Sequence, residues 1–198
     1  MNTSFEKFAG WMAVLAGASG FLYSVSFIVW RNELLSALFL MLGGLFSSAA
    51  LTALYQRLRG TDSGFALLGF LLTLSGALGS AIHGGYNLAN ALHPPLALAA
   101  DVPNPIDPRG LLTFGMAGLG LFLLSRLLTQ EMRFPKSLAY LGMLSAILMI
   151  ILYLGRLIIL DATNPAIVIP ALLEGFIVNP IWYIWLGLIL LRSMNSSK

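Results

Sequence analysis

Four polar but uncharged residues stand together at the end of an otherwise apolar stretch, residues 71–92. They are His83, Tyr86, Asn87 and Asn90. In a helix His83 and Asn87 share a face, and Asn90 follows one turn later. A histidine in this setting can relay protons or ligate a metal or haem, and the amides can hold a polar ligand. The alternative for His83 is a hydrogen-bonded packing role, which is the commoner one for a single histidine beside glycines.

Arg156 and Glu174 are the charged residues that lie within adjacent apolar stretches. Isolated charges at that depth are costly, so we expect the two side chains to approach each other. A salt bridge that ties the last two helices together and a shared contact to a substrate are both compatible with this pattern. Snorkelling of Arg156 towards water is the alternative.

Asn179 and Pro180 interrupt the last apolar stretch near its middle, and Trp182 follows. A proline there frees a carbonyl group and kinks a helix. Trp182 is too deep for an interfacial belt, so it either lines a cavity or fills the interior. The candidate ligand-binding residues are therefore His83, Tyr86, Asn87, Asn90, Arg156, Glu174, Asn179 and Trp182.

Motifs of catalysis and metal binding are not found in the sequence. It has no phosphate-binding glycine loop, no HExxH, no supported Ser–His–Asp set and no cysteine. His83 and His93 are ten residues apart, so a continuous helix cannot bring both to one haem. We assign no catalytic or metal-binding residue and leave any cofactor open.

Composition indicates a membrane protein. Of the 198 residues 58% are hydrophobic and 10% are charged, whereas about a quarter of the residues in a soluble domain are charged. The net charge of +3 is small, and the basic residues are scattered. Nucleic-acid binding needs a concentrated basic face, so it is excluded as a function class.

Six stretches are long enough to cross a bilayer, which takes about 20 apolar residues. We predict an all-α fold, a single domain of six transmembrane helices. β-structure is excluded because open sheets cannot cross lipid and the stretches do not alternate. The predicted spans are residues 8–30, 34–56, 64–92, 110–129, 137–160 and 166–191.

The basic residues in the connections predict the orientation. Three of the 11 would lie on one side, at Arg31, Arg109 and Arg156. The other side would hold the remaining eight: Lys7, Arg57, Arg59, Arg126, Arg133, Lys136, Arg192 and Lys198. The bias predicts cytoplasmic termini in a multi-pass protein of the bacterial inner membrane.

Two proline-rich segments shape the predicted external side. Residues 93–109 contain five of the nine prolines, which favours an extended loop. This loop either roofs a site or simply joins two distant helix ends. Pro165 and Pro170 interrupt the start of the sixth stretch. That helix begins either near residue 166 or only near Pro170, and in the second case residues 162–169 form an interfacial turn.

Small residues predict where helices pack closely, because backbone approach drives association in lipid. Gly76, Ser80 and Gly84 form a stripe that should face another helix. Similar glycines in the first, second and fourth stretches predict a close-packed bundle of the first four helices. The fifth is largely Leu, Ile and Met, so much of it should face lipid. Oligomer contacts are an alternative use of the stripes.

Two sequence phrases resemble those of bacterial six-helix integral membrane proteins that have no established activity. They are RFPKSLAYLG at residues 133–142 and NPIWYIWLG at residues 179–187. The resemblance also covers the layout of the spans. It implies a six-helix fold and contributes no catalytic residue.

These observations predict a non-enzymatic membrane protein with a polar pocket open to the external side. The pocket would bind a lipid, a quinone or another small amphiphile. An accessory subunit of a larger membrane complex, or a homo-oligomer, is one alternative. A small transporter is another, and the interrupted sixth helix would serve it.

Overall fold

The computed structural model describes residues 4–94, 110–159, 161 and 163–192, and these are helical without any strand. The expected proline-rich loop falls mainly on residues 95–109, outside this range. Three π-helical segments (η) interrupt or flank the α-helices. The elements are α1 Ser4–Ser24, η1 Val25–Val29, α2 Glu33–Leu58, α3 Ser63–Leu92, η2 Leu111–Met116, α4 Ala117–Leu128, α5 Lys136–Ile158, α6 Pro165–Leu173, η3 Glu174–Val178 and α7 Asn179–Arg192.

These elements form six continuous helices that are long and apolar enough to cross a membrane. They run over Ser4–Val29, Glu33–Leu58, Ser63–Leu92, Leu111–Leu128, Lys136–Ile158 and Pro165–Arg192. The predicted all-α fold with six spans is confirmed, and the boundaries differ from the expected ones by a few residues. The protein is a multi-pass integral membrane protein.

Side-chain caps explain where three spans begin. Asn32 accepts a hydrogen bond from the Leu35 amide at 2.9 Å, and Asp62 accepts one from the Phe65 amide at 3.0 Å. Asn164 caps α6 in the same way, with Pro165 in its first turn. Such caps satisfy amides that have no partner within the helix.

The sixth span begins within one residue of the predicted start at 166, and not near Pro170. α6 runs from Pro165, and Pro170 lies buried inside it rather than at its start. The Asn164 cap and Pro165, whose missing N–H costs nothing in a first turn, start the helix. The single hydrogen bond that Pro170 removes does not stop it.

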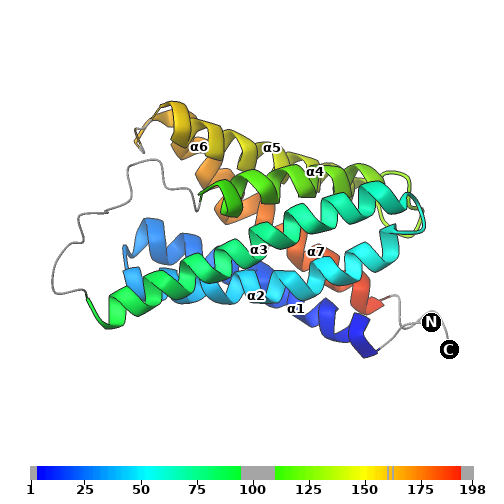
Figure 1. Cartoon of the computed structure of the whole chain (residues 1–198), viewed down its shortest axis with the longest axis horizontal. Helices are drawn as coiled ribbons and strands as arrows, with labels where there is room; N and C mark the ends of the chain where they lie inside the picture. Colours follow the sequence, from blue (N-terminus) through cyan, green and yellow to red (C-terminus); the bar gives the residue numbers. More distant parts are fainter. Residues whose placement is uncertain (1–3, 95–109, 160, 162, 193–198) are drawn as a thin grey trace.

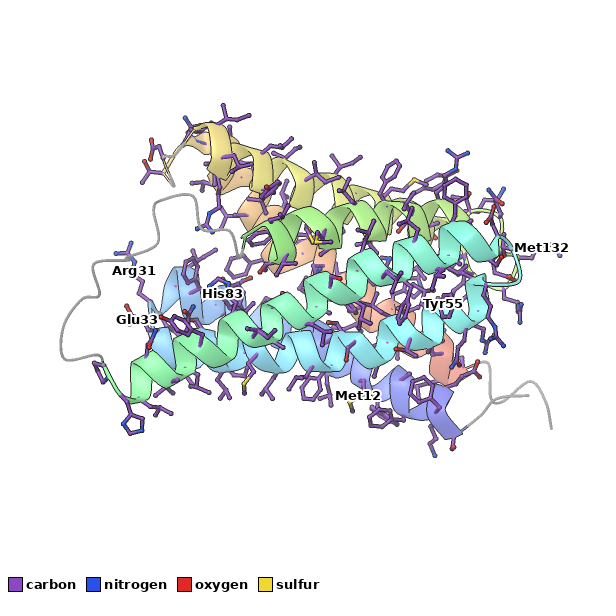
Figure 2. All side chains as sticks on the ribbon, viewed as in Figure 1. Met12, Arg31, Glu33, Tyr55, His83 and Met132 are labelled. Carbon is purple, nitrogen blue, oxygen red and sulfur yellow. The ribbon has the colours of Figure 1, made fainter. Side chains whose placement is uncertain are left out.

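The six spans form a closed ring. Each span packs against its neighbours in the chain, and α7 returns to pack against α1. Figure 1 shows that the start of α1 and the end of α7 lie at the same end of the bundle. We call this the terminal end. The opposite end carries the turn at residues 30–32 and is called the loop end; Figure 2 shows Arg31 and Glu33 there and Met132 at the terminal end.

Glycines allow the close approach of neighbouring backbones. A Cβ atom on Gly76 would lie 2.5 Å from the Ala117 Cβ atom, and one on Gly84 would collide with the Met41 amide. The predicted stripe therefore faces α4 at one level and α2 at another, as expected. α1 and α7 are equally close, because a Cβ atom on Gly17 would lie 2.7 Å from the Pro180 carbonyl oxygen. This last contact was not predicted.

The largest buried side chains gather towards the terminal end. They include Leu54, Leu58, Leu124, Leu128, Leu138, Trp182, Leu186 and Leu190. Much of the fifth span faces outwards, as predicted, for example at Tyr140, Ile151 and Ile158. The predicted contrast with the first four spans, which were expected to be packed more closely, is wrong. Half of its apolar window is buried, more than in any other span. Small residues such as Ala139, Gly142 and Ala146 let α4 and α7 pack on this helix.

Candidate ligand-binding cavity

A cavity of about 390 Å³ lies inside the ring, and all six spans contribute to its walls. Phe27 and Arg156 line it near the loop end. It reaches down to Leu51 and Leu121, past the middle of their spans. Most of its lining residues are apolar, and the volume falls in the range of small-molecule sites.

Glu174 is the acidic residue that lines this cavity, and its side chain is almost fully buried, at 5% exposure. Its Oε1 atom accepts a hydrogen bond of 2.6 Å from the Ser145 hydroxyl and one of 3.1 Å from the Asn179 side-chain amide. Its Oε2 atom is buried without a hydrogen-bond partner. An unsatisfied buried acceptor is costly, so this atom is a natural position for the donor of a ligand.

The π-helical segment η3 explains how Glu174 and Asn179 meet. The Asn179 backbone N–H group donates a hydrogen bond to the backbone carbonyl of Glu174, five residues earlier. A bond between residues five apart defines a π-helix. In an α-helix, residues five apart point in different directions, whereas the wider turn brings them to neighbouring faces. Gly175 makes room for this segment against α1, since a Cβ atom there would collide with the Ser24 hydroxyl.

Arg156 lines the same cavity but makes no salt bridge with Glu174, so the predicted bridge is absent. Both residues are described, and neither is in the ion pairs found, which include Glu6–Arg57 and Glu131–Arg133. Instead, the carboxylate turns to Ser145 and Asn179. Arg156 remains exposed. Its positive charge interacts electrostatically with Tyr23, another lining residue. A long basic side chain can keep its head towards the interface in this way.

Of the eight candidate residues, Arg156, Glu174 and Asn179 line the cavity. The α3 candidates are not among the lining residues. There His83, Asn87 and Asn90 are half-buried, and Tyr86 is 58% exposed. Figure 2 places His83 in the half of the bundle nearer the loop end. A ligand role for these four residues stays a prediction.

Trp182 fills the interior rather than lining the cavity. It is fully buried, and its indole nitrogen lies over Gly142, where a Cβ atom would be 2.6 Å away. The kink expected at Asn179–Pro180 takes the form of η3 followed by α7. Pro180 sits in the first turn of α7, where a missing N–H is best tolerated.

Two residues of the site were not among the eight candidates, Ser145 and Tyr183. Ser145 is the only serine or threonine among residues 138–158 of α5, and this isolated small hydroxyl in an apolar run is a usable signal for a buried polar contact. Tyr183 lines the cavity and hydrogen-bonds to Ser47 on α2.

Comparisons with protein-family models, curated proteins and solved structures found no match. The described residues also contain no group of three or more His, Asp or Glu that could hold a metal ion. The chemistry of the cavity is therefore the basis for a functional assignment.

Proposed function

We propose that this protein is a non-enzymatic membrane protein whose internal cavity binds a small amphiphile, of which lipids and quinones are examples. The observation that carries the proposal is the buried Oε2 atom of Glu174, which has no partner and belongs to a cavity with mainly apolar walls. An amphiphile would supply a polar group to this atom and an apolar body to the walls.

The free energies support a ligand over an empty site. Burial of a polar group without a hydrogen bond costs about 1–3 kcal/mol in proteins. A ligand group that pairs with Oε2 removes that cost. The apolar body of the ligand would restore the packing contacts that the walls around Leu51 and Leu121 lack.

The location that we propose is the bacterial inner membrane, with cytoplasmic termini. The bias of basic residues towards the terminal end and the resemblance to bacterial six-helix proteins support it. On this orientation the cavity extends from the external half, where Phe27 and Arg156 line it, to just past the middle of the membrane. Met132, 98% exposed in a turn at the terminal end, provides the test, since the chain has no native cysteine. A Met132→Cys variant should react with an impermeant thiol reagent only from the cytoplasmic side, and external labelling would reverse the orientation.

Native mass spectrometry of the purified protein, combined with a cavity-filling variant, tests the binding function. A Cβ atom on Gly43, which lines the cavity, meets only Ser19, at 3.6 Å. Gly43→Leu should therefore fill the cavity without moving a backbone. We expect the unchanged protein to carry a small amphiphile that Gly43→Leu lacks.

Gly85→Leu is the matched control. A Cβ atom at Gly85 meets only the Met41 sulfur, at 3.7 Å, and Gly85 is not a lining residue. This variant should keep the amphiphile. Equal loading of all three proteins would place the molecule outside the cavity and refute the proposal, while a stoichiometric partner protein in place of an amphiphile would favour an accessory subunit.

A small transporter is the second candidate, and the three π-helical segments favour it. η1, η2 and η3 all contribute residues to the cavity, at Phe27, Thr113 and Glu174. Irregular helical turns recur at functional sites and at the broken helices of transporters. Counterflow of the copurifying molecule in proteoliposomes would support transport, and retention without exchange would exclude it.

A further inference from the structure

The hydroxyl groups of the cavity wall turn their protons away from the cavity. Ser47 donates to the Gly44 carbonyl at 3.0 Å, and Ser80 donates to the Gly76 carbonyl, also at 3.0 Å. Thr73 donates to Gly69 at 2.8 Å, and Ser24 donates to Gly20 at 3.2 Å. A hydroxyl has one proton and two lone pairs. Ser24, Thr73 and Ser80 therefore present lone pairs, as acceptors, to whatever occupies the cavity, while Ser47 also hydrogen-bonds to Tyr183.

The polar groups around Glu174 follow the same pattern. The side-chain amide of Asn179 and the hydroxyl of Ser145 both donate to Oε1. Oε2 has no donor within reach. Tyr23, Tyr183 and Arg156 bring donors to the lining. Arg156 lies closer to the loop end than Glu174 does, and Tyr183 hydrogen-bonds to Ser47. Around Glu174 the polar wall thus offers more acceptors than donors.

We infer that the cavity selects an amphiphilic primary amine, whose ammonium group donates hydrogen bonds to the Oε2 atom of Glu174. This inference rests on the proposed amphiphile binding and narrows it. A primary ammonium group has three donors and no acceptor, which complements this wall. A quinone offers only acceptors and leaves Oε2 unsatisfied, and a fatty acid adds a second carboxylate.

Charge favours the ammonium group over a neutral hydroxyl. No cation pairs with Glu174 within the described residues, since Arg156 forms no bridge with it. Hydrogen bonds between ionised partners are about twice as strong as neutral ones. The positive charge of Arg156 near the loop end disfavours the ammonium there, so the head group would settle at Glu174, with its chain towards Leu51 and Leu121.

Four amphiphiles with the same ten-carbon chain test this selectivity. They are decylamine, decyltrimethylammonium, decanol and decanoate, each titrated into the protein in nanodiscs of zwitterionic lipid while the thermal unfolding midpoint is followed. We expect decylamine to raise the midpoint most. Decyltrimethylammonium keeps the charge but has no N–H donor, so it should act only at concentrations on the order of tenfold higher.

Glu174→Gln and Glu33→Gln form a matched pair of variants. Each removes one negative charge, but Glu33 is exposed at the loop end, where Figure 2 shows it, and does not line the cavity. The decylamine response should weaken on the order of tenfold in Glu174→Gln and remain in Glu33→Gln. If Glu174→Gln does not fold, the order in which the four amphiphiles raise the unfolding midpoint of the unchanged protein still tests the preference for an amine.

The outcomes separate the inference from the proposed function. An equal response to decanol and decylamine, or a stronger response to decanoate, would overturn the amine assignment. If the response to decanol or decanoate disappears in Gly43→Leu, the proposed binding of an amphiphile in the cavity still stands. A response to none of the four, together with no copurifying amphiphile, would overturn both.

Discussion

The two halves of the bundle are built from similar residues but differ in how these are packed. Towards the terminal end, large side chains such as Leu54, Leu128 and Trp182 are fully buried against one another. Towards the loop end, the same ring of helices encloses a cavity of about 390 Å³. Figure 1 shows the helices of this half farther apart than those near the terminal end.

The helices themselves differ between the halves. All three π-helical segments, Val25–Val29, Leu111–Met116 and Glu174–Val178, lie in the loop-end half of their spans. The terminal-end half is regular α-helix up to the turns. The comparison indicates that the packed half maintains the fold, while the irregular half can accommodate a polar site without loss of the core.

The largest expected effect is a difference in the free energy of unfolding between alanine substitutions at two leucines on α2. Leu54 is fully buried in the packed half, whereas Leu40 lines the cavity. Leu54→Ala should lower the free energy of unfolding by about 2 kcal/mol, the low end for buried leucines, because lipid is as apolar as the core. Leu40→Ala should cost less than about 1 kcal/mol, since it enlarges an existing cavity. Reversible unfolding in mixed micelles measures both, and equal losses would mean that the two halves are packed alike.

An intermediate effect distinguishes two adjacent glycines, Gly43 and Gly44. A Cβ atom on Gly44 would collide with the Ala77 carbonyl oxygen, but one on Gly43 meets only Ser19, at 3.6 Å. Gly44→Ala should force α2 and α3 apart and cost about 1–3 kcal/mol. Gly43→Ala should stay within about 0.5 kcal/mol of the unchanged protein. Comparable destabilisation by both variants in the same unfolding assay would contradict the close approach at Gly44.

The smallest expected effect lies at the turn that closes the packed half. The Arg133 side chain donates a 2.8 Å hydrogen bond to Glu131, and this bond lowers the pKa of the Glu131 carboxyl below its usual value. A carboxyl whose pKa is lowered by folding adds stability above its unfolded pKa, about 4.3. That stability disappears as the pH falls through the lower, folded pKa.

Glu131→Gln should therefore reduce the acid sensitivity of the thermal unfolding midpoint below about pH 4.3. The effect on the free energy should be below about 1 kcal/mol, since Arg133 is mostly exposed. Thermal scans at several pH values in both proteins provide the measurement. A larger acid effect that persists in Glu131→Gln would point to other carboxyl groups.

Some features of the fold could be predicted because they depend on neighbouring residues alone. The six spans follow from runs of apolar residues, and the starts of α2 and α3 follow from their capping residues, Asn32 and Asp62. Gly76 and Gly84 also face neighbouring helices, as predicted. The sixth span starts at Pro165, next to the predicted residue 166, and the alternative start near Pro170 was wrong because it gave one proline more weight than the Asn164 cap.

The candidate site was predicted only in part. Glu174, Arg156 and Asn179 were identified as unusual polar residues, and all three line the cavity. The partner expected for Glu174 was Arg156, but the structure brings Ser145 to it from 29 residues away. Which charges pair depends on the rotation of each helix about its axis, and the sequence does not specify that rotation.

The sequence by itself determined that this chain is a six-span helical membrane protein with few intramembrane charges. Hydropathy is a sum over consecutive residues, so it fixes the number and length of the spans. Only the tertiary structure decided that α7 closes the ring against α1, that η3 turns Glu174 and Asn179 together, and that the loop-end half is hollow. The reason is physical: lipid is as apolar as the protein interior, so hydrophobicity cannot show which face of a helix points inwards.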